Sequence, residues 1–408
     1  MRLRPVLVLC ALFPVAPLAA FDFPQWRGPA RDGRVSVPAR EGWPEALRLG
    51  WKVKAGVGHA SPLVSGDRVF LFSREGEEEV AQSFELATGK RVWRGAYPAP
   101  YSMNPAATSH GKGPKSTPVV ADGRLYTLGI SGILSCYDAT SGHLVWRKEF
   151  AGQFKETSPL YGTAMSPVVE GGVLIAHVGG HGDGALTAFD SATGAVRWAW
   201  KGDGPGYASP VVGTIGGARQ VVTQSQDNVV GLSAEKGELL WKIPLTTSYE
   251  QNAVTPVLAG DLVIYGGLDQ PMRAVRVAKK GAAWTPERIW ENPEVAAYLS
   301  SPVLEGGKLY GFSHRKRGQF FCLDAATGRT LWLSNGRQAE SAAVLAGGGA
   351  LFLLTTDGAL IVAARDAPAF KPLRTWTVAE SATWAHPAVL EGALLVKDVD
   401  TLTLWRIP

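Results

Sequence analysis

Eight residues of mixed chemistry stand at equivalent places in the chain, two positions before a recurring Ser-Pro or Thr-Pro dipeptide or its counterpart. In chain order they are His59, Lys115, Ala164, Tyr207, Ala253, Leu299, Glu340 and Trp384. A purely structural position would tend to repeat one residue type, whereas this set combines a cation, an anion, an imidazole and aromatic rings. A site for a small polar ligand needs such a combination. The alternative is that each side chain packs against its neighbours or faces water. The candidate ligand-binding residues are His59, Lys115, Tyr207, Glu340 and Trp384.

The longest insertion between two repeats is YPAPYSMNPAATSHGKGPK, at residues 97–115. Its polar side chains are Tyr101, Asn104, His110 and Lys112. Long ordered loops often carry function, so the insertion either caps the candidate site or packs as a surface loop. His110 joins the candidate ligand-binding residues on the first of these interpretations.

Standard catalytic signatures are absent from the sequence. It contains no HExxH, no CxxC pair, no G-x-S-x-G and no phosphate-binding loop. Asp183 in GGHGDG (179–184) could hold a cation, but a Gly-rich hairpin turn is the favoured interpretation. A calcium site needs six or more oxygen ligands, and no acidic cluster has loop-like spacing. We therefore assign no catalytic residue and no metal ligand.

The elements that must position these residues carry a repeated phrase, seen as YDATSGHLVWRK at 137–148 and FDSATGAVRWAW at 189–200. Asp190 and Thr193 can hydrogen-bond backbone amides of a tight turn, and Gly194 can adopt a positive φ there. The Trp that follows buries a large surface, and its indole N–H can reach a carbonyl of the neighbouring repeat. We interpret these Trp residues as structural fasteners between repeats: Trp51, Trp93, Trp146, Trp198, Trp241, Trp290, Trp332 and Trp376.

Each repeat consists of four short β-segments separated by turns. In one repeat the segments are 164–170, 173–178, 185–190 and 195–200, with the last alternating Val196, Trp198 and Trp200 on one face. A period of about 40 to 50 residues built from four strands is the signature of a β-propeller.

The count of strands predicts how the ring closes. Seven complete units run from 58 to 380, and residues 384–408 hold only three strands. The segment LRLGWKV (47–53), with Trp51, supplies the missing strand. We predict an all-β, eight-bladed propeller of four-stranded antiparallel blades, closed by an N-terminal strand that completes the last blade.

Cys136 and Cys322 fall at equivalent places in blades two and six, too far apart for a disulfide, so we predict two buried free thiols.

The N-terminus indicates export. Residues 1–20 combine Arg2 and Arg4, a short apolar run and a small-residue cleavage site, as a signal peptide does. A membrane anchor is the alternative, and the bulky Leu9 disfavours a lipoprotein anchor at Cys10. We divide the chain into a signal peptide (1–20), an extension (21–45) and a propeller (46–408). We expect a periplasmic or secreted monomer without a transmembrane segment after cleavage.

The small net charge of +5, mixed along the chain, argues against nucleic-acid binding.

The repeated A/S-x-x-T-G-x-x-x-W phrase, with its preceding Ser-Pro strand, resembles the pyrroloquinoline-quinone-like (PQQ-like) propeller repeat over roughly 46–408. Two branches of that superfamily are relevant. Quinoprotein dehydrogenases bind PQQ and a metal, usually Ca²⁺, over the propeller axis. BamB-like proteins are eight-bladed periplasmic scaffolds that assist outer-membrane barrel assembly and carry no cofactor. The length suits the second branch, and the adjacent Cys pair of many dehydrogenases is missing. WRGPARDG (26–33) resembles the mature start of other secreted PQQ-like repeat proteins.

The resemblance leaves three functions open. The first is an exported, non-enzymatic scaffold that binds an envelope protein or another envelope component. The second is a PQQ-dependent oxidoreductase of the alcohol or sugar dehydrogenase type, with PQQ stacked on Trp384 and its carboxylates held by Lys115 and His59. The third is a propeller that binds a glycan or small polar ligand without redox chemistry.

Overall fold

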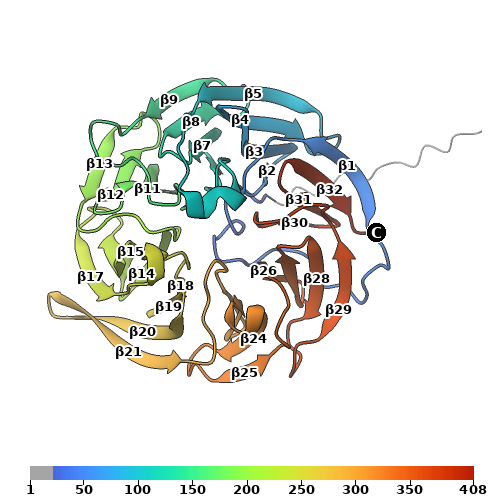
Figure 1. The fold of residues 1–408 in the computed structure, drawn as a ribbon. Helices are drawn as coiled ribbons and strands as arrows, with labels where there is room; N and C mark the ends of the chain where they lie inside the picture. Colours follow the sequence, from blue (N-terminus) through green and yellow to red (C-terminus); the bar gives the residue numbers. More distant parts are fainter. Residues whose placement is uncertain (1–21) are drawn as a thin grey trace, which may run out of the picture.

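Eight sheets of four antiparallel strands stand in a ring around a central axis in the computed structural model, which describes residues 22–408 (Figure 1). The predicted fold class is therefore confirmed. The predicted signal peptide and Cys10 lie outside the described residues. Within residues 22–408, no helix is long and apolar enough to cross a membrane.

Each of blades one to seven is built from four consecutive strands, the first nearest the axis. Blades one to four comprise β2 (Leu63–Ser65), β3 (Arg68–Glu75), β4 (Glu78–Glu85), β5 (Arg91–Pro98); β6 (Val119–Ala121), β7 (Arg124–Leu128), β8 (Leu134–Asp138), β9 (Leu144–Lys148); β10 (Val168–Glu170), β11 (Val173–Gly180), β12 (Asp183–Asp190), β13 (Val196–Trp200); β14 (Val211–Ile215), β15 (Ala218–Gln224), β16 (Asn228–Ser233) and β17 (Leu239–Pro244). Blades five to seven comprise β18 (Val257–Ala259), β19 (Leu262–Gly267), β20 (Gln270–Lys280), β21 (Ala283–Asn292); β22 (Val303–Glu305), β23 (Lys308–Ser313), β24 (Gln319–Asp324), β25 (Thr330–Leu333); β26 (Ala342–Gly347), β27 (Ala350–Thr355), β28 (Ala359–Ala364) and β29 (Pro372–Thr377). Three short 3₁₀ helices lie in the loops: η1 (Pro105–His110), η2 (Ser248–Glu250) and η3 (Arg315–Arg317).

The eighth blade joins the two ends of the described chain. Strands β30 (Ala388–Leu390), β31 (Ala393–Lys397) and β32 (Thr401–Arg406) are completed by β1 (Arg48–Lys54), which pairs antiparallel with β32. Trp51 lies opposite Leu404 in this pairing. The predicted closure is confirmed. Because β1 completes the last blade, each of the eight described blades has four strands, and none has an open place where a strand of another chain could pair.

The repeated turn phrase fastens one blade to the next. The Asp190 carboxylate accepts hydrogen bonds from the backbone N–H and the hydroxyl of Thr193, at 2.9 and 2.8 Å. The indole N–H of Trp93 donates to the carbonyl of Ala139 in the next blade at 2.9 Å. Equivalent bonds to the following blade are made by Trp51, Trp146, Trp198 and Trp290. Where the following blade keeps this turn, the Trp of the preceding blade is therefore tied to it.

Blades five and seven lack the Asp-Thr-Gly turn, and the Trp residues that face them bond differently. Trp241 donates to the side-chain oxygen of Gln220 in its own blade at 2.7 Å. Trp332 packs against Phe370, with ring centroids 5.7 Å apart. A degenerate turn thus removes the carbonyl that a Trp of the preceding blade would otherwise find.

We expect Gly142→Ala to lower the free energy of unfolding by about 2 kcal/mol more than Gly123→Ala. Both glycines have a positive φ, near 70°, so both substitutions carry the same backbone strain. A Cβ at Gly142 would come within 2.5 Å of the Trp93 ring, whereas nothing lies within 4 Å of a Cβ at Gly123. Urea unfolding followed by circular dichroism measures both variants. Equal losses would contradict close Trp–turn packing as the reason for this glycine.

The two cysteines of the described chain are free and buried, as predicted. Burial raises the pKa of the Cys136 thiol to about 11 and that of Cys322 to about 12. Both thiols are therefore protonated at neutral pH and unreactive.

Candidate functional site

A ring of hydroxyl groups surrounds the axis at the start of the inner strands. The backbone N–H of Ser61 donates to the Thr117 hydroxyl of the next blade at 3.0 Å, and that of Thr117 donates to Ser166 at 3.0 Å. The same step, at 2.9 to 3.0 Å, continues from Ser166 through Ser209 and Thr255 to Ser301, and the backbone N–H of His386 in blade eight donates to the Ser61 hydroxyl. Within residues 22–408 the step is interrupted at blade seven, where Ala342 has no hydroxyl and donates instead to Ser300. The hydroxyl residues of the ring are those of the Ser-Pro and Thr-Pro dipeptides. The repeat motif therefore stitches neighbouring blades together around the axis.

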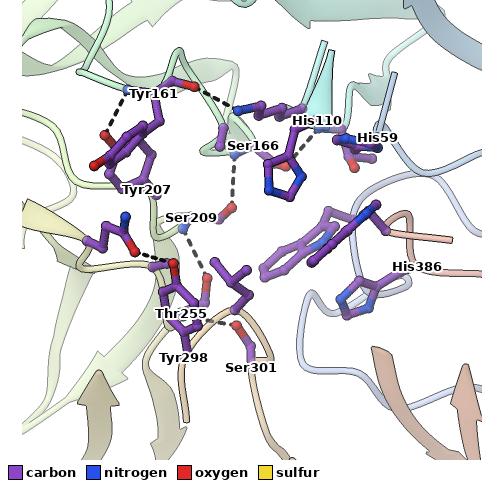
Figure 2. Close-up of a pocket in the computed structure, with 18 of the residues that line it drawn as sticks. His59, His110, Tyr161, Ser166, Tyr207, Ser209, Thr255, Tyr298, Ser301 and His386 are labelled. Carbon is purple, nitrogen blue, oxygen red and sulfur yellow. Dashed lines mark hydrogen bonds between the residues drawn. The ribbon is translucent and has the colours of Figure 1, made fainter. Parts of the chain in front are cut away.

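A cavity of about 690 Å³ opens above this hydroxyl ring (Figure 2). All six ring hydroxyl residues line it, together with the aromatic side chains Trp26, Tyr161, Tyr207, Tyr249, Tyr298 and Trp384. Helix η1 of the long insertion adds Ala106, Ala107 and His110 to the wall. The insertion thus lies over the axis, and the side chain of Asn104 caps η1 by accepting from Ala106 N–H at 2.9 Å.

The cavity brings together five of the six candidate ligand-binding residues. They are His59, His110, Lys115, Tyr207 and Trp384. The His110 ring lies 4.8 Å from Trp384 and 5.8 Å from His59, centroid to centroid. Lys115 donates to the carbonyl oxygen of Tyr161 at 2.8 Å. We call this cavity the axial pocket.

Glu340 is the candidate that does not line the axial pocket. In six blades the inner strand begins two residues after the ring hydroxyl, because the intervening Pro has no N–H to donate to the sheet. Blade seven has Ala343 in place of that Pro, and β26 already begins at Ala342. Glu340 was selected by its spacing of two residues before the counterpart of the Ser-Pro dipeptide. That spacing does not apply in blade seven, because the strand begins earlier there.

Burial controls the charge of the basic groups in the pocket. Burial, together with the nearby basic groups His110, Lys115 and Lys397, lowers the pKa of His59 to about 3. Burial likewise lowers the pKa of His386 to about 3. Lys115, whose pKa falls to about 8 on burial, is still mostly protonated at neutral pH. At that pH the pocket wall therefore presents neutral imidazoles and one ammonium group.

The N-terminal segment 22–35 closes the axis below the pocket. Phe23 forms a bridge to Val64 in blade one, and Gln25 to Val119 in blade two. The Arg31 guanidinium donates to the carbonyls of Ser166, Pro167 and Pro210, at 2.8 to 3.1 Å. Arg27 donates to the carbonyl of Pro302 at 2.5 Å. We call residues 22–35 the axial plug, because it bonds to inner strands around the ring.

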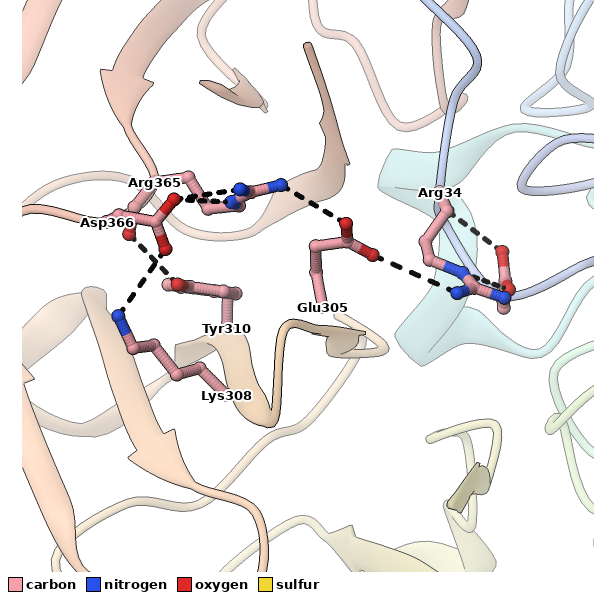
Figure 3. A network of polar contacts seen from close by, with 7 residues as sticks. Arg34, Glu305, Lys308, Tyr310, Arg365 and Asp366 are labelled. Carbon is pink, nitrogen blue, oxygen red and sulfur yellow. Dashed lines mark hydrogen bonds and ion pairs between the residues drawn. The ribbon is translucent and has the colours of Figure 1, made fainter. Parts of the chain in front are cut away.

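Trp26 forms the floor of the pocket, between the plug cations and the cavity. Its ring lies 5.4 Å from the Arg27 guanidinium carbon, 5.9 Å from that of Arg31 and 5.4 Å from the His386 ring. The plug leaves the axis beside blades six and seven. There Arg34 pairs with Asp32 at 2.6 Å and approaches Glu305, which also holds Arg365 (Figure 3).

The hydroxyl ring, the axial plug and the Trp26 floor were not predicted from the sequence. The hydroxyl ring could have been inferred from the Ser or Thr that precedes Pro in six repeats. A residue type that recurs at the same position of each repeat suggests a contact that recurs between neighbouring blades. WRGPARDG carried a signal for the plug, because two Arg residues four positions apart need hydrogen-bond acceptors if the segment packs against the propeller. No local pattern pointed to Trp26 as a pocket floor.

Comparisons with known proteins agree on the fold. The family described as outer membrane protein assembly factor BamB matches residues 76–334. A protein of that name from Yersinia pestis is 22% identical over 298 residues, which cover 69% of this chain and 68% of the relative. BamB from Moraxella catarrhalis superposes with a TM-score of 0.63 and 14% identity, covering 89% of this chain and 98% of that one. A europium-containing methanol dehydrogenase superposes with a TM-score of 0.69 and 12% identity, covering 94% and 98%.

The axial pocket does not fit the calcium ion that would accompany a quinone cofactor. Calcium takes six to eight oxygen ligands, carboxylates among them. No Asp or Glu lines the pocket, and residues 22–408 contain no group of three or more His, Cys, Asp or Glu able to hold a metal. The ring hydroxyl oxygens already accept backbone N–H groups. The residues present thus lack the donor set for this metal.

Proposed function

The chain belongs to the family of the outer membrane protein assembly factor BamB, and from this premise we propose that it is a non-enzymatic binding propeller of the bacterial cell envelope. In this proposal the face that carries the mouth of the axial pocket docks another envelope protein. The leader at 1–20 directs export, and the propeller acts as a monomeric scaffold in the periplasm or outside the cell.

The observation that carries the proposal is a displayed apolar rim at the mouth of the pocket. Tyr249 is 71% exposed and Leu299 is 40% exposed, and both line the pocket. Leu160, 45% exposed, directly precedes the pocket residue Tyr161. Exposed aromatic and aliphatic side chains beside a concave site are typical of protein-binding surfaces.

Tyr249 is held outward by a strained turn. Tyr249 and Glu250 both have positive φ, at 62° and 57°, which costs a non-Gly residue about 1 kcal/mol or more each. The Glu250 carboxylate pairs with His181 and accepts from Gln226 at 3.2 Å, so the turn is pinned to its neighbours. Strain that is kept in place to expose an aromatic ring supports a role in recognition.

We expect a photo-crosslinking amino acid at position 249 to join this chain to one defined envelope protein in living cells. Leu144, 49% exposed on the outermost strand of blade two, is the matched control position and should give no specific adduct. Leu299→Ser should reduce the adduct about tenfold, because it removes apolar contact area from the same rim. Mass spectrometry of the adducts is the measurement.

Two results would count against this function. Equal adduct yields at 249 and 144, or an adduct unaffected by Leu299→Ser, would contradict docking at the rim. Saturable binding of PQQ with Ca²⁺, followed by the quinone absorbance and lost in Lys115→Ala, would favour the dehydrogenase alternative instead.

A further inference from the structure

The axial pocket is rich in hydrogen-bond donors and carries charge of one sign. No Asp or Glu is among its lining residues within 22–408, and its ionisable side chains other than tyrosine are His59, His110, Lys115 and His386. Glu340 lies near enough to raise the pKa of His110 slightly, but burial and Lys115 outweigh it and lower that pKa.

The hydroxyl ring supplies one free O–H donor from each of its six residues. Each of Ser61, Thr117, Ser166, Ser209, Thr255 and Ser301 accepts a backbone N–H from the preceding blade. Among the described residues, none of these six O–H groups has an acceptor. A hydroxyl whose lone pair is engaged still has a proton to donate. The ring therefore presents O–H donors that an acceptor-rich ligand could use.

Two buried imidazoles in the pocket also lack partners. His59 Nε2 and His386 Nδ1 are buried and make no hydrogen bond to the described residues. The His386 side chain is only 7% exposed. Buried polar atoms without a partner are rare in native structures and are expected to meet a ligand or water. Both atoms belong to the walls of the same cavity.

Two permanent cations lie beneath the floor. Arg27 and Arg31 are 1% and 3% exposed, and neither forms an ion pair within residues 22–408. Their guanidinium groups are held by backbone carbonyls and flank Trp26. A buried cation without a carboxylate leaves a positive potential that a low-dielectric surrounding screens weakly. The Trp26 ring lies between these guanidinium groups and the pocket, so the positive potential extends into the pocket.

We propose that the axial pocket binds a small, ring-bearing organic anion without a metal. Its charged group is held by the ring hydroxyls and Lys115 and is attracted by Arg27 and Arg31 beneath the floor. Its ring packs among Trp26, Trp384 and the wall tyrosines. The six hydroxyl donors and the carboxylate-free lining favour the same ligand chemistry, and the unpartnered His386 Nδ1 can donate to such a ligand as the Nδ1–H tautomer. The proposal does not depend on protein docking at the rim, and either one can fail alone.

The anionic fluorophore anilinonaphthalene sulfonate and its neutral relative N-phenylnaphthylamine form the test pair. We expect the anion to bind the full mature chain at one saturable site, with affinity at least about tenfold above that of the neutral probe. Lys115→Met keeps the aliphatic stem and should weaken the anion about tenfold while leaving the neutral probe within about twofold. Lys112→Met, on the same loop but exposed and outside the pocket, should change neither affinity.

The wild-type protein supplies a second measurement that needs no variant. Anion affinity should fall between about pH 7 and pH 9.5 as Lys115, whose pKa is about 8, loses its proton. The titratable or charged groups facing it are His59, His110, Tyr161 and, behind His59, Lys397. Lys397 also has a pKa near 8, so the Lys115→Met variant should flatten, though not abolish, this dependence.

Competition identifies the charged group. Benzoate or phenyl phosphate should displace the fluorophore, and neutral benzamide should not. The stronger of the two competitors distinguishes a carboxylate site from a phosphate site. EDTA should leave binding unchanged. The proposal is overturned by the absence of saturable binding, by equal affinities for the charged and neutral probes, by equal loss of both in Lys115→Met, or by loss of binding in EDTA.

Discussion

Lowering the pH from 6.5 to about 4.5 is expected to reduce the free energy of unfolding by about 7 kcal/mol. Burial holds the pKa of three histidines far below their usual value of 6.5: His59 at about 3, His177 at about 4 and His386 at about 3. Each one then accounts for a loss of about 2.2 kcal/mol over these two pH units. The sum rivals the whole stability of an ordinary domain, so we expect acid unfolding above pH 4.

The direction follows from proton counting. Below pH 6.5 these histidines bind a proton in the unfolded chain but remain neutral in the folded one. The unfolded state therefore binds more protons, and stability falls as the pH falls. The stabilising contribution is complete above pH 6.5 and is lost progressively down to the folded-state values near 3 to 4. Asp190, whose pKa Arg197 and Thr193 lower to about 2, stabilises the fold above its ordinary pKa of 3.8 and adds to the acid loss only below that value.

Urea unfolding at several pH values measures this slope. His177 is the cleanest site, because it lies on β11, is 2% exposed, and contacts only the Asp203 carbonyl through Nε2, at 3.1 Å. His177→Gln should remove about one third of the acid loss. Exposed His143 provides the matched control, and His143→Gln should leave the slope unchanged. A wild-type stability that stays flat between pH 6.5 and 4.5 would contradict the prediction.

The propeller was predictable because its information is local and repeated. The Asp-Thr-Gly turn and the following Trp lie within about ten residues, and several copies average out the noise in any one of them. The closing strand β1 followed from the count, since a three-stranded last blade would leave an open edge. The degenerate turns facing Trp241 and Trp332 show the limit of such counting, because a missing turn changes the partner of the preceding blade's Trp.

The pocket was predictable only in part, for the same physical reason. His59, Lys115, Tyr207 and Trp384 share one position in the repeat, and the ring brings equivalent positions together. The plug has no counterpart in the repeat. The hydrogen bonds of Arg27 and Arg31 to carbonyls near the inner strands join residues 135 to 275 positions apart, such as Arg27 with Pro302, and no periodicity encodes them. Non-periodic segments that cross the axis therefore have to be found in three dimensions.

Replacing Arg31 by Leu is expected to lower the free energy of unfolding by about 4 kcal/mol. The guanidinium is the hydrogen-bond donor to three carbonyls that lie just before the inner strands β10 and β14, those of Ser166, Pro167 and Pro210. These oxygens have no neighbouring strand on the side of Arg31, so Leu would leave them buried without a donor, at about 1 to 3 kcal/mol each. Relief from burying an unpaired charge offsets only part of this loss.

The same substitution at Arg34 separates the effect of the buried contacts from that of charge. Arg34 lies three residues further along the same segment, with a side chain that is 57% exposed and paired with Asp32. Arg34→Leu removes an equal charge and should cost less than about 1 kcal/mol, as exposed ion pairs do. Urea unfolding gives both values, and protease cleavage within 22–35 reports whether the plug has left the axis. If Arg31→Leu is no less stable than Arg34→Leu and the plug stays protected, the carbonyl contacts do not hold this segment, and the bridges of Phe23 and Gln25 must do so instead.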